Sequence, residues 1–204
     1  MKKSILTFLA VASLVACKKN ETTAMNTSTD SSTVMAPTDS SLLPSADSLS
    51  MSGTAETSAT LTDQDKMFAD KAAKGGMMEV ALGEYAETNA SNASVKALGK
   101  MMKEDHTKAN NDLKSWAANA GYSLPTAMDA DMQKKVDDLK AKKGADFDKA
   151  YTDLMVEDHK EDIALFKEEV NTGSAGTLKA FAASTIPTLE HHLTKSEEAK
   201  KAVK

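Results

Sequence analysis

The sequence contains one cysteine and few aromatic residues, and these shortages already restrict what the chain can be. A single cysteine among 204 residues rules out a disulfide bond within one chain. Aromatic residues make up 4% of the sequence, and the β-branched residues that strands favour are also in short supply. Alanine, lysine, leucine, methionine and glutamate are abundant instead, and all of them favour helices. We therefore expect an all-α protein.

Clustered charge and catalytic signatures are also missing. The formal net charge is -5, and acidic and basic residues are interspersed, as on solvated helix faces. Nucleic acid is not an expected partner, because its binding needs a clustered basic face. The sequence contains no Ser-His-Asp motif, phosphate-binding loop or dinucleotide fingerprint. These absences favour a non-enzymatic module and leave enzyme activity open.

The N-terminus has the features of a bacterial export signal. Lys2 and Lys3 make its start positive, and the apolar run over residues 4–15 is too short to span a bilayer comfortably. Leu14-Val15-Ala16-Cys17 resembles a lipobox, in which the cysteine is acylated and becomes the mature N-terminus. We therefore predict a signal peptide over residues 1–16 and a lipid on Cys17. The alternative is an ordinary secretory signal followed by a chance cysteine.

The next segment, residues 17–60, is predicted to be a flexible tether. It is dominated by serine, threonine, alanine and aspartate, so it cannot bury enough apolar surface to offset its ordering entropy. The lipid would attach the protein to a membrane, and Lys18 after the cysteine favours the outer membrane by resemblance to lipoprotein sorting. No protein partner can be predicted from the sequence.

The remaining residues, 61–204, have the periodicity of one helical domain. Apolar stripes predict four long helices, over about 62–89, 92–120 and 146–171, and from about 174 onward. Short turns make the first two helices one antiparallel hairpin and the last two another. Residues 121–145, with a short helix predicted over 129–142, form a connection far longer than such a turn requires. This pattern predicts a ferritin-like four-helix bundle with one long crossover.

Four polar residues interrupt the apolar stripes, one on each long helix: Glu79, His106, His159 and His192. Glu79 and His106 lie at similar distances from the first hairpin turn, and His159 and His192 lie at similar distances from the second. All four side chains are therefore expected to meet near the middle of the bundle. One interpretation is structural, with each group satisfied by a neighbouring side chain or by water. The other is a metal site that satisfies them together.

The spacing around the histidines argues against a dinuclear iron centre. Di-iron bundles use Glu-x-x-His on two helices, whereas Lys103, Val156 and Leu189 stand three residues before the histidines here. Asp162, three residues after His159, is the nearest substitute. The metal hypothesis is therefore a mononuclear site of three histidines and Glu79, holding zinc, iron or copper, all of which accept imidazole.

Two further features of the sequence have ordinary explanations. Met102 and Met155 each precede a stripe histidine by four residues, and thioethers suit copper, but methionine is also a common core residue. We expect these two to be core residues. His191 lies off the stripe and is expected to face solvent or, at most, to contact one of the site residues without binding metal itself.

Four short motifs resemble those of the domain-of-unknown-function family 4142. They are Gly75-Gly76-Met77-Met78-Glu79-Val80-Ala81-Leu82-Gly83, Met102-Lys103-Glu104-Asp105-His106, Met155-Val156-Glu157-Asp158-His159 and Ile186-Pro187-Thr188-Leu189-Glu190-His191-His192-Leu193. They occur in the same order as in the family, and the resemblance runs from about Thr62 to the end. It implies a ferritin-like four-helix fold of bacterial envelope proteins whose biochemical activity is not established.

Overall fold

A computed structural model describes residues 60–204 of the chain. The predicted signal peptide, Cys17 and the predicted tether, up to residue 59, lie outside the described residues. Within 60–204 the structure contains helices and no strand. The helices are α1 (Asp63–Asn89), α2 (Ala93–Ala120), α3 (Ala130–Ala141), α4 (Gly144–Thr172) and α5 (Gly176–Ala202).

Local signals set the ends of the first two helices. Thr62 and Asp65 form a capping box at the start of α1, in which each side chain bonds the other residue's backbone N–H. The side chain of Asn92 accepts a hydrogen bond from the Ser94 N–H at the start of α2. Gly121 ends α2 with a φ of 65°, a left-handed conformation that glycine adopts without strain.

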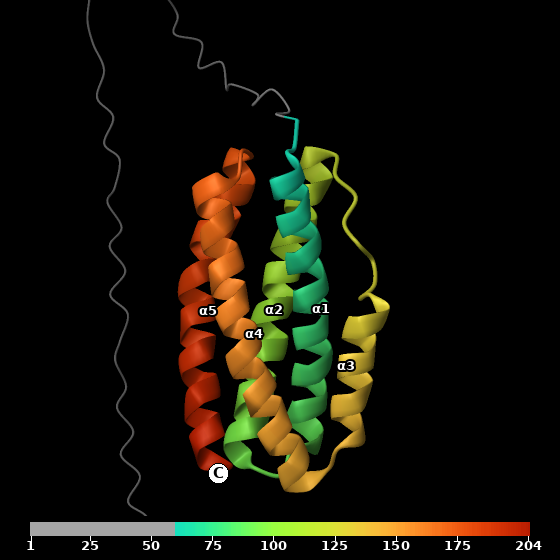
Figure 1. Ribbon diagram of the computed structural model, residues 1–204, viewed down its shortest axis with the longest axis vertical. Helices are drawn as coiled ribbons and strands as arrows, with labels where there is room; N and C mark the ends of the chain where they lie inside the picture. Colours follow the sequence, from blue (N-terminus) through green and yellow to red (C-terminus); the bar gives the residue numbers. More distant parts are fainter. Residues whose placement is uncertain (1–59) are drawn as a thin grey trace, which may run out of the picture. The chain divides into compact units, whose positions relative to one another are not determined.

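The long helices form two antiparallel hairpins, α1–α2 and α4–α5, as predicted (Figure 1). The crossover leaves the end of α2, runs back along the bundle and includes α3, which lies beside α1. This connection returns the chain to the end of the bundle where α4 begins. The predicted all-α, ferritin-like bundle is confirmed, and every helix boundary named above lies within about two residues of its predicted position.

The apolar core consists of two clusters along the bundle axis. The first cluster lies at the end of the bundle that holds the α1–α2 turn and includes Leu82, Met102 and Tyr151. The second lies toward the α4–α5 turn and includes Phe68 and Leu178. On α2, α4 and α5 the polar stripe residue falls between the residues of these two clusters, and on α1 Glu79 directly follows Met78, where the first cluster begins. The core therefore encloses a polar layer.

The two hairpins are joined by a reciprocal pair of aspartates. Asp65 of α1 accepts hydrogen bonds from the backbone N–H groups of Ser174 and Ala175 at 2.8 and 3.1 Å. These groups begin α5, which has no side-chain cap of its own. Asp148 of α4 accepts from the backbone N–H groups of Ser91 and Asn92 in the other turn. Each hairpin thus caps the other.

This reciprocity reflects an internal repeat. The number of residues from Asp65 to Asp148 equals the number from Glu79 to Asp162 and from one turn serine, Ser91, to the other, Ser174. The histidines do not follow the repeat, because its equivalent of His159 is Gly76. The capping aspartates and the turn serines therefore occupy equivalent positions in the two hairpins, whereas the histidines do not.

Replacing Asp65 with alanine should destabilise the protein by about 1–2 kcal/mol at pH 7, the range measured for the loss of helix caps. Burial raises the pKa of Asp65, but hydrogen bonds from Ser174, Thr62 and Ala175 outweigh burial and hold this pKa below its usual range. A lowered folded-state pKa stabilises the protein above the unfolded value and loses that effect in acid. Urea unfolding should therefore show the difference between wild type and variant shrinking only below about pH 4.

The control for this prediction is Asp63→Ala, because Asp63 lies in the same turn of α1 but is exposed. Its contact with Lys66 is a surface ion pair of 3.7 Å, which contributes little to stability. Equal effects of the two substitutions on the urea midpoint would contradict the capping role of Asp65.

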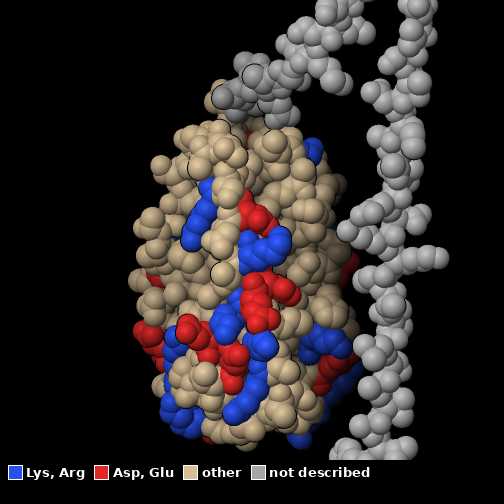
Figure 2. Space-filling model, turned by 180° about the vertical axis from the view of Figure 1, so that it is seen from behind, with Lys and Arg blue, Asp and Glu red and all other residues tan. Residues whose placement is uncertain are grey.

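The surface carries both signs of charge side by side. On the face seen in Figure 2, lysines alternate with acidic residues, and no extended area of one sign is visible there. Among the described residues, lysines and aspartates one helical turn apart form ion pairs, such as Lys108–Asp112 at 2.7 Å and Lys134–Asp138 at 2.6 Å. Such pairs support exposed helix faces. None of the helices within residues 60–204 has the length and apolarity needed to cross a bilayer.

Candidate metal centre

The structure brings Glu79, His106, His159 and His192 together in the polar layer. One ring nitrogen of each histidine lies within 4.8 Å of the others, and the ring centroids are 5.1–5.5 Å apart. The Glu79 carboxylate lies 2.9 Å from His106 Nδ1 and 3.6 Å from His159 Nε2. The four side chains come from four different helices, so folding of the whole bundle assembles the cluster.

The hydrogen bonds of His159 and His192 determine which of their nitrogens is free. His159 Nδ1 lies 2.9 Å from the Met155 carbonyl oxygen, which can only accept, so Nδ1 carries the proton and Nε2 a lone pair. His192 Nε2 lies 2.9 Å from a carboxylate oxygen of Asp105. The His192 proton is therefore on Nε2, and its Nδ1 carries a lone pair.

Those two lone pairs face each other. His159 Nε2 and His192 Nδ1 are 3.2 Å apart, a hydrogen-bond distance that needs a proton between them. A proton there would make one ring an imidazolium, which a buried site disfavours. Burial, the first cause in each case, lowers the pKa of His159 to about 3 and that of His192 to about 4. At neutral pH the two nitrogens are therefore two electron-pair donors directed at one point.

His106 and Glu79 carry the other free ligand atoms. Within residues 60–204, His106 Nε2 and Glu79 Oε1 are buried without a hydrogen-bond partner. Burial lowers the pKa of His106 to about 4. It raises the pKa of Glu79 well above its usual range, and the charge of Asp158 raises it further. Leaving such groups unpaired costs about 1–3 kcal/mol each, so the layer is poorly satisfied by its own side chains.

Two carboxylates next to the cluster were missed as site residues by sequence reasoning. Asp162 lies within hydrogen-bonding reach of Glu79, and burial together with the Glu79 charge raises the pKa of Asp162 well above its usual range. Asp105 orients His192, as carboxylates orient metal-bound histidines in other proteins. The only sequence signal for Asp105 was its place in the Met-x-Glu-Asp-His motif. Asp162 was considered only as a substitute in a di-iron spacing.

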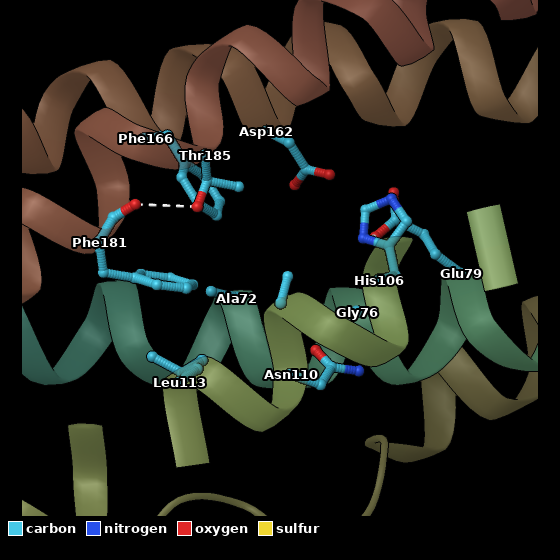
Figure 3. Close-up of a pocket in the computed structure, with 11 residues that line it drawn as sticks. Ala72, Gly76, Glu79, His106, Asn110, Leu113, Asp162, Phe166, Phe181 and Thr185 are labelled. Atoms are coloured by element: carbon cyan, nitrogen blue, oxygen red, sulfur yellow. Dashed lines mark hydrogen bonds and ion pairs between the residues drawn. The ribbon is translucent and has the colours of Figure 1, made fainter. Parts of the chain in front are cut away.

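A small cavity adjoins the cluster (Figure 3). Its volume is about 20 Å³, enough for one water molecule. Glu79, His106 and Asp162 lie at one end of the view, and Phe166 and Phe181 lie at the other. The cavity can therefore accept one ligand the size of water beside His106.

Glycines set the approach of α1 and α2 beside this layer. A Cβ atom on Gly83 would lie 2.7 Å from the Gly99 carbonyl oxygen, and one on Gly99 would lie 2.7 Å from the Gly83 carbonyl oxygen. Both distances are shorter than real Cβ contacts. A Cβ on Gly76 would meet the Asn110 side chain at 2.1 Å. Gly83 and Gly99 let the two backbones pack closely, whereas Gly76 leaves room for the Asn110 side chain.

Residues 50–199 match the family model described as a domain of unknown function, DUF4142. The chain belongs to the DUF4142 family. A solved structure is also similar to it, "Crystal structure of DUF305 fragment from Deinococcus radiodurans", with a TM-score of 0.61 and 11% sequence identity. The similarity covers 70% of this chain and 98% of that chain, and at this identity it shows the fold alone. No curated protein matches the chain.

The other residues considered in this DUF4142 chain occupy the places expected from the sequence. Met102 and Met155 are fully buried in the first apolar cluster. Both are therefore core residues, and the Met155 carbonyl also orients His159. His191 is exposed, as its place off the stripe predicted.

Proposed function

We propose that this chain binds one transition-metal ion inside its four-helix bundle, held by Glu79, His106, His159 and His192. The main support is the 3.2 Å contact between His159 Nε2 and His192 Nδ1, where two lone pairs meet in a buried layer. A metal ion would accept both pairs. A proton in the same place would have to charge an imidazole whose pKa burial has lowered.

The ligand set suits zinc, iron or copper. Three imidazoles and one carboxylate are common donors for these ions, and the donor types alone do not separate them. A divalent charge would also stabilise the ionised forms of Glu79 and Asp162, which burial disfavours. Storage of the metal ion, sensing of the metal ion and protection of the envelope would each use such a site.

Titration of the purified protein with Zn²⁺, Cu²⁺ and Fe²⁺ tests this proposal. We expect one equivalent to bind to wild type and almost none to bind to His106→Ala or His159→Ala. Absence of bound metal under every supply condition would favour the alternative from the sequence, a metal-free structural or interaction module of the envelope.

We further propose that the bundle is held at a membrane by lipid on Cys17, in the outer membrane. The support is the lipobox-like Leu14-Val15-Ala16-Cys17 and the lysine that follows it. Several acyl chains anchor a protein stably where one does not, because each buried methylene contributes about 0.8 kcal/mol.

Cys17→Ser should move the protein from the membrane fraction to the soluble fraction, because the acylated thiol is lost. Fractionation of cells followed by immunodetection measures this change. Ser13→Ala, a substitution in the same segment that keeps the cysteine, is the control and should leave the protein with the membranes. Membrane association of the Cys17→Ser variant would show that lipid is not the anchor.

A further inference from the structure

All four side chains of the proposed metal cluster are buried inside the bundle. His159 is 0% exposed, His192 1%, Glu79 2% and His106 6%. An ion therefore cannot reach the histidines from solvent without passing other side chains, and the proposed site needs an access route.

A groove beside α3 reaches the cluster from outside. It has a volume of about 460 Å³ and lies between α1, α4 and the first half of α3. The α3 groove is lined by five carboxylates and three lysines, so acidic groups outnumber basic ones. The carboxylates are Glu79, Asp129, Asp158, Glu161 and Asp162, and the lysines are Lys71, Lys74 and Lys135. Glu79 and Asp162 also line the small cavity next to His106. These two carboxylates therefore separate an outer space from an inner one.

We propose that the α3 groove is the access route by which the cation enters the proposed metal site, and that Asp162 passes the ion from the groove to Glu79. This inference rests on the metal-binding function proposed above. It assigns a role to α3, which the long crossover places against α1 and α4 (Figure 1).

The carboxylates of α4 make a path of suitable chemistry. Asp158 and Asp162 are one helical turn apart and therefore share a face of the helix, and both line the groove. Within the described residues, Asp158 Oδ2 is buried without a hydrogen-bond partner. Carboxylate oxygens bind transition-metal ions more weakly than imidazole does, so an ion would move from oxygen donors outside to nitrogen donors inside.

One of the three lysines that line the groove is ion-paired across it. Lys74 of α1 lies 3.6 Å from Asp129 at the start of α3, and both side chains are partly exposed. This ion pair links α1 to the crossover, and the lysine charge opposes the approach of a cation. The ion pair and the lysine charge should both slow the uptake of a cation without changing the residues that bind it.

Gly75 also lines the groove and offers a way to block it without altering a ligand. A Cβ atom on Gly75 would meet only Asp162 Oδ1, at 4.0 Å, an ordinary contact distance. A leucine side chain there would extend into the groove. Gly75→Ala is the matched control, because it makes the same change in helix propensity and leaves most of the groove open.

The test is the rate of Co²⁺ uptake by the purified protein, followed by visible absorbance in stopped flow, together with the equilibrium affinity. Gly75→Leu should slow uptake by at least about tenfold, equivalent to about 1.4 kcal/mol of barrier. Gly75→Ala should stay within about twofold of wild type. Lys74→Ala, which removes one of the lysines that line the groove, should speed uptake. The affinities of all three variants should equal that of wild type.

Each outcome bears on a separate claim. If wild type binds none of Co²⁺, Zn²⁺, Cu²⁺ and Fe²⁺, the proposed metal site is wrong. If wild type binds Co²⁺ and Gly75→Leu takes it up at the wild-type rate, the site stands and the α3 groove is not the route. Faster uptake in Asp105→Ala alone would then place the route beside Asp105, whose side chain is 45% exposed. If Gly75→Leu does not fold, an unchanged rate in Lys74→Ala overturns the proposal.

Discussion

Zn²⁺ added to the purified protein should raise its free energy of unfolding by about 4 kcal/mol once the free ion reaches a thousand times its dissociation constant. The reason is that the four ligands come from four helices, so the unfolded chain does not hold them together. Thermal unfolding monitored by circular dichroism, with and without Zn²⁺, measures the effect. The melting temperature should keep rising as the Zn²⁺ concentration increases, as linkage requires.

The size of this shift should depend on the ligands and not on histidine in general. His106→Ala and His159→Ala should abolish most of the shift, because each removes a buried donor. His191→Ala is the matched control, since His191 is exposed beside His192 in the chain and should leave the shift intact. If none of Zn²⁺, Cu²⁺ and Fe²⁺ changes the melting temperature, the proposed metal site is overturned.

The helices and their connections were predictable because their signals are local or periodic. Apolar spacing and caps such as Thr62 and Gly121 depend only on residues within one or two helical turns. The crossover followed from the length of the segment between the hairpins. The fold of this DUF4142 chain was therefore accessible from one sequence.

The meeting of the four polar stripe residues was also predictable, because antiparallel hairpins place equal distances from a turn at equal heights. What the sequence could not supply was their orientation. Asp105 reaches His192 on another helix, and that contact depends on helix rotation and on the side-chain conformation. The same holds for Asp65, whose role in capping α5 joins two distant segments. Long-range polar contacts of this kind leave no periodic pattern.

The access route likewise depends on packing that periodicity does not encode. Val136 and Leu139 bury the second half of α3 in the first apolar cluster, whereas Met132, in its first half, borders the groove. A short helix that is anchored by one half leaves a space beside the other. The sequence predicted a short helix in the crossover, but it did not predict which face of the bundle α3 covers.

His159→Phe should stabilise the metal-free protein by about 1–2 kcal/mol, because it removes one of two lone pairs that face each other in a buried layer. Phenylalanine keeps an aromatic ring at this fully buried position. The Met155 carbonyl oxygen keeps the backbone hydrogen bond of the helix, so the loss of His159 Nδ1 does not leave this acceptor unpaired. Sites built for a ligand are often less stable empty than an apolar replacement would be. Urea unfolding in the presence of a chelator measures the change.

The same variant separates the two interpretations of the cluster. If the histidines are a metal site, His159→Phe gains stability without metal and loses the stabilisation by Zn²⁺. If they are a satisfied structural network, breaking the contact with His192 lowers stability in the chelator as well. His191→Phe controls for the substitution itself, because it makes the same change at an exposed position of the same helix pair. A loss of stability confined to His159→Phe would therefore favour the metal-free module.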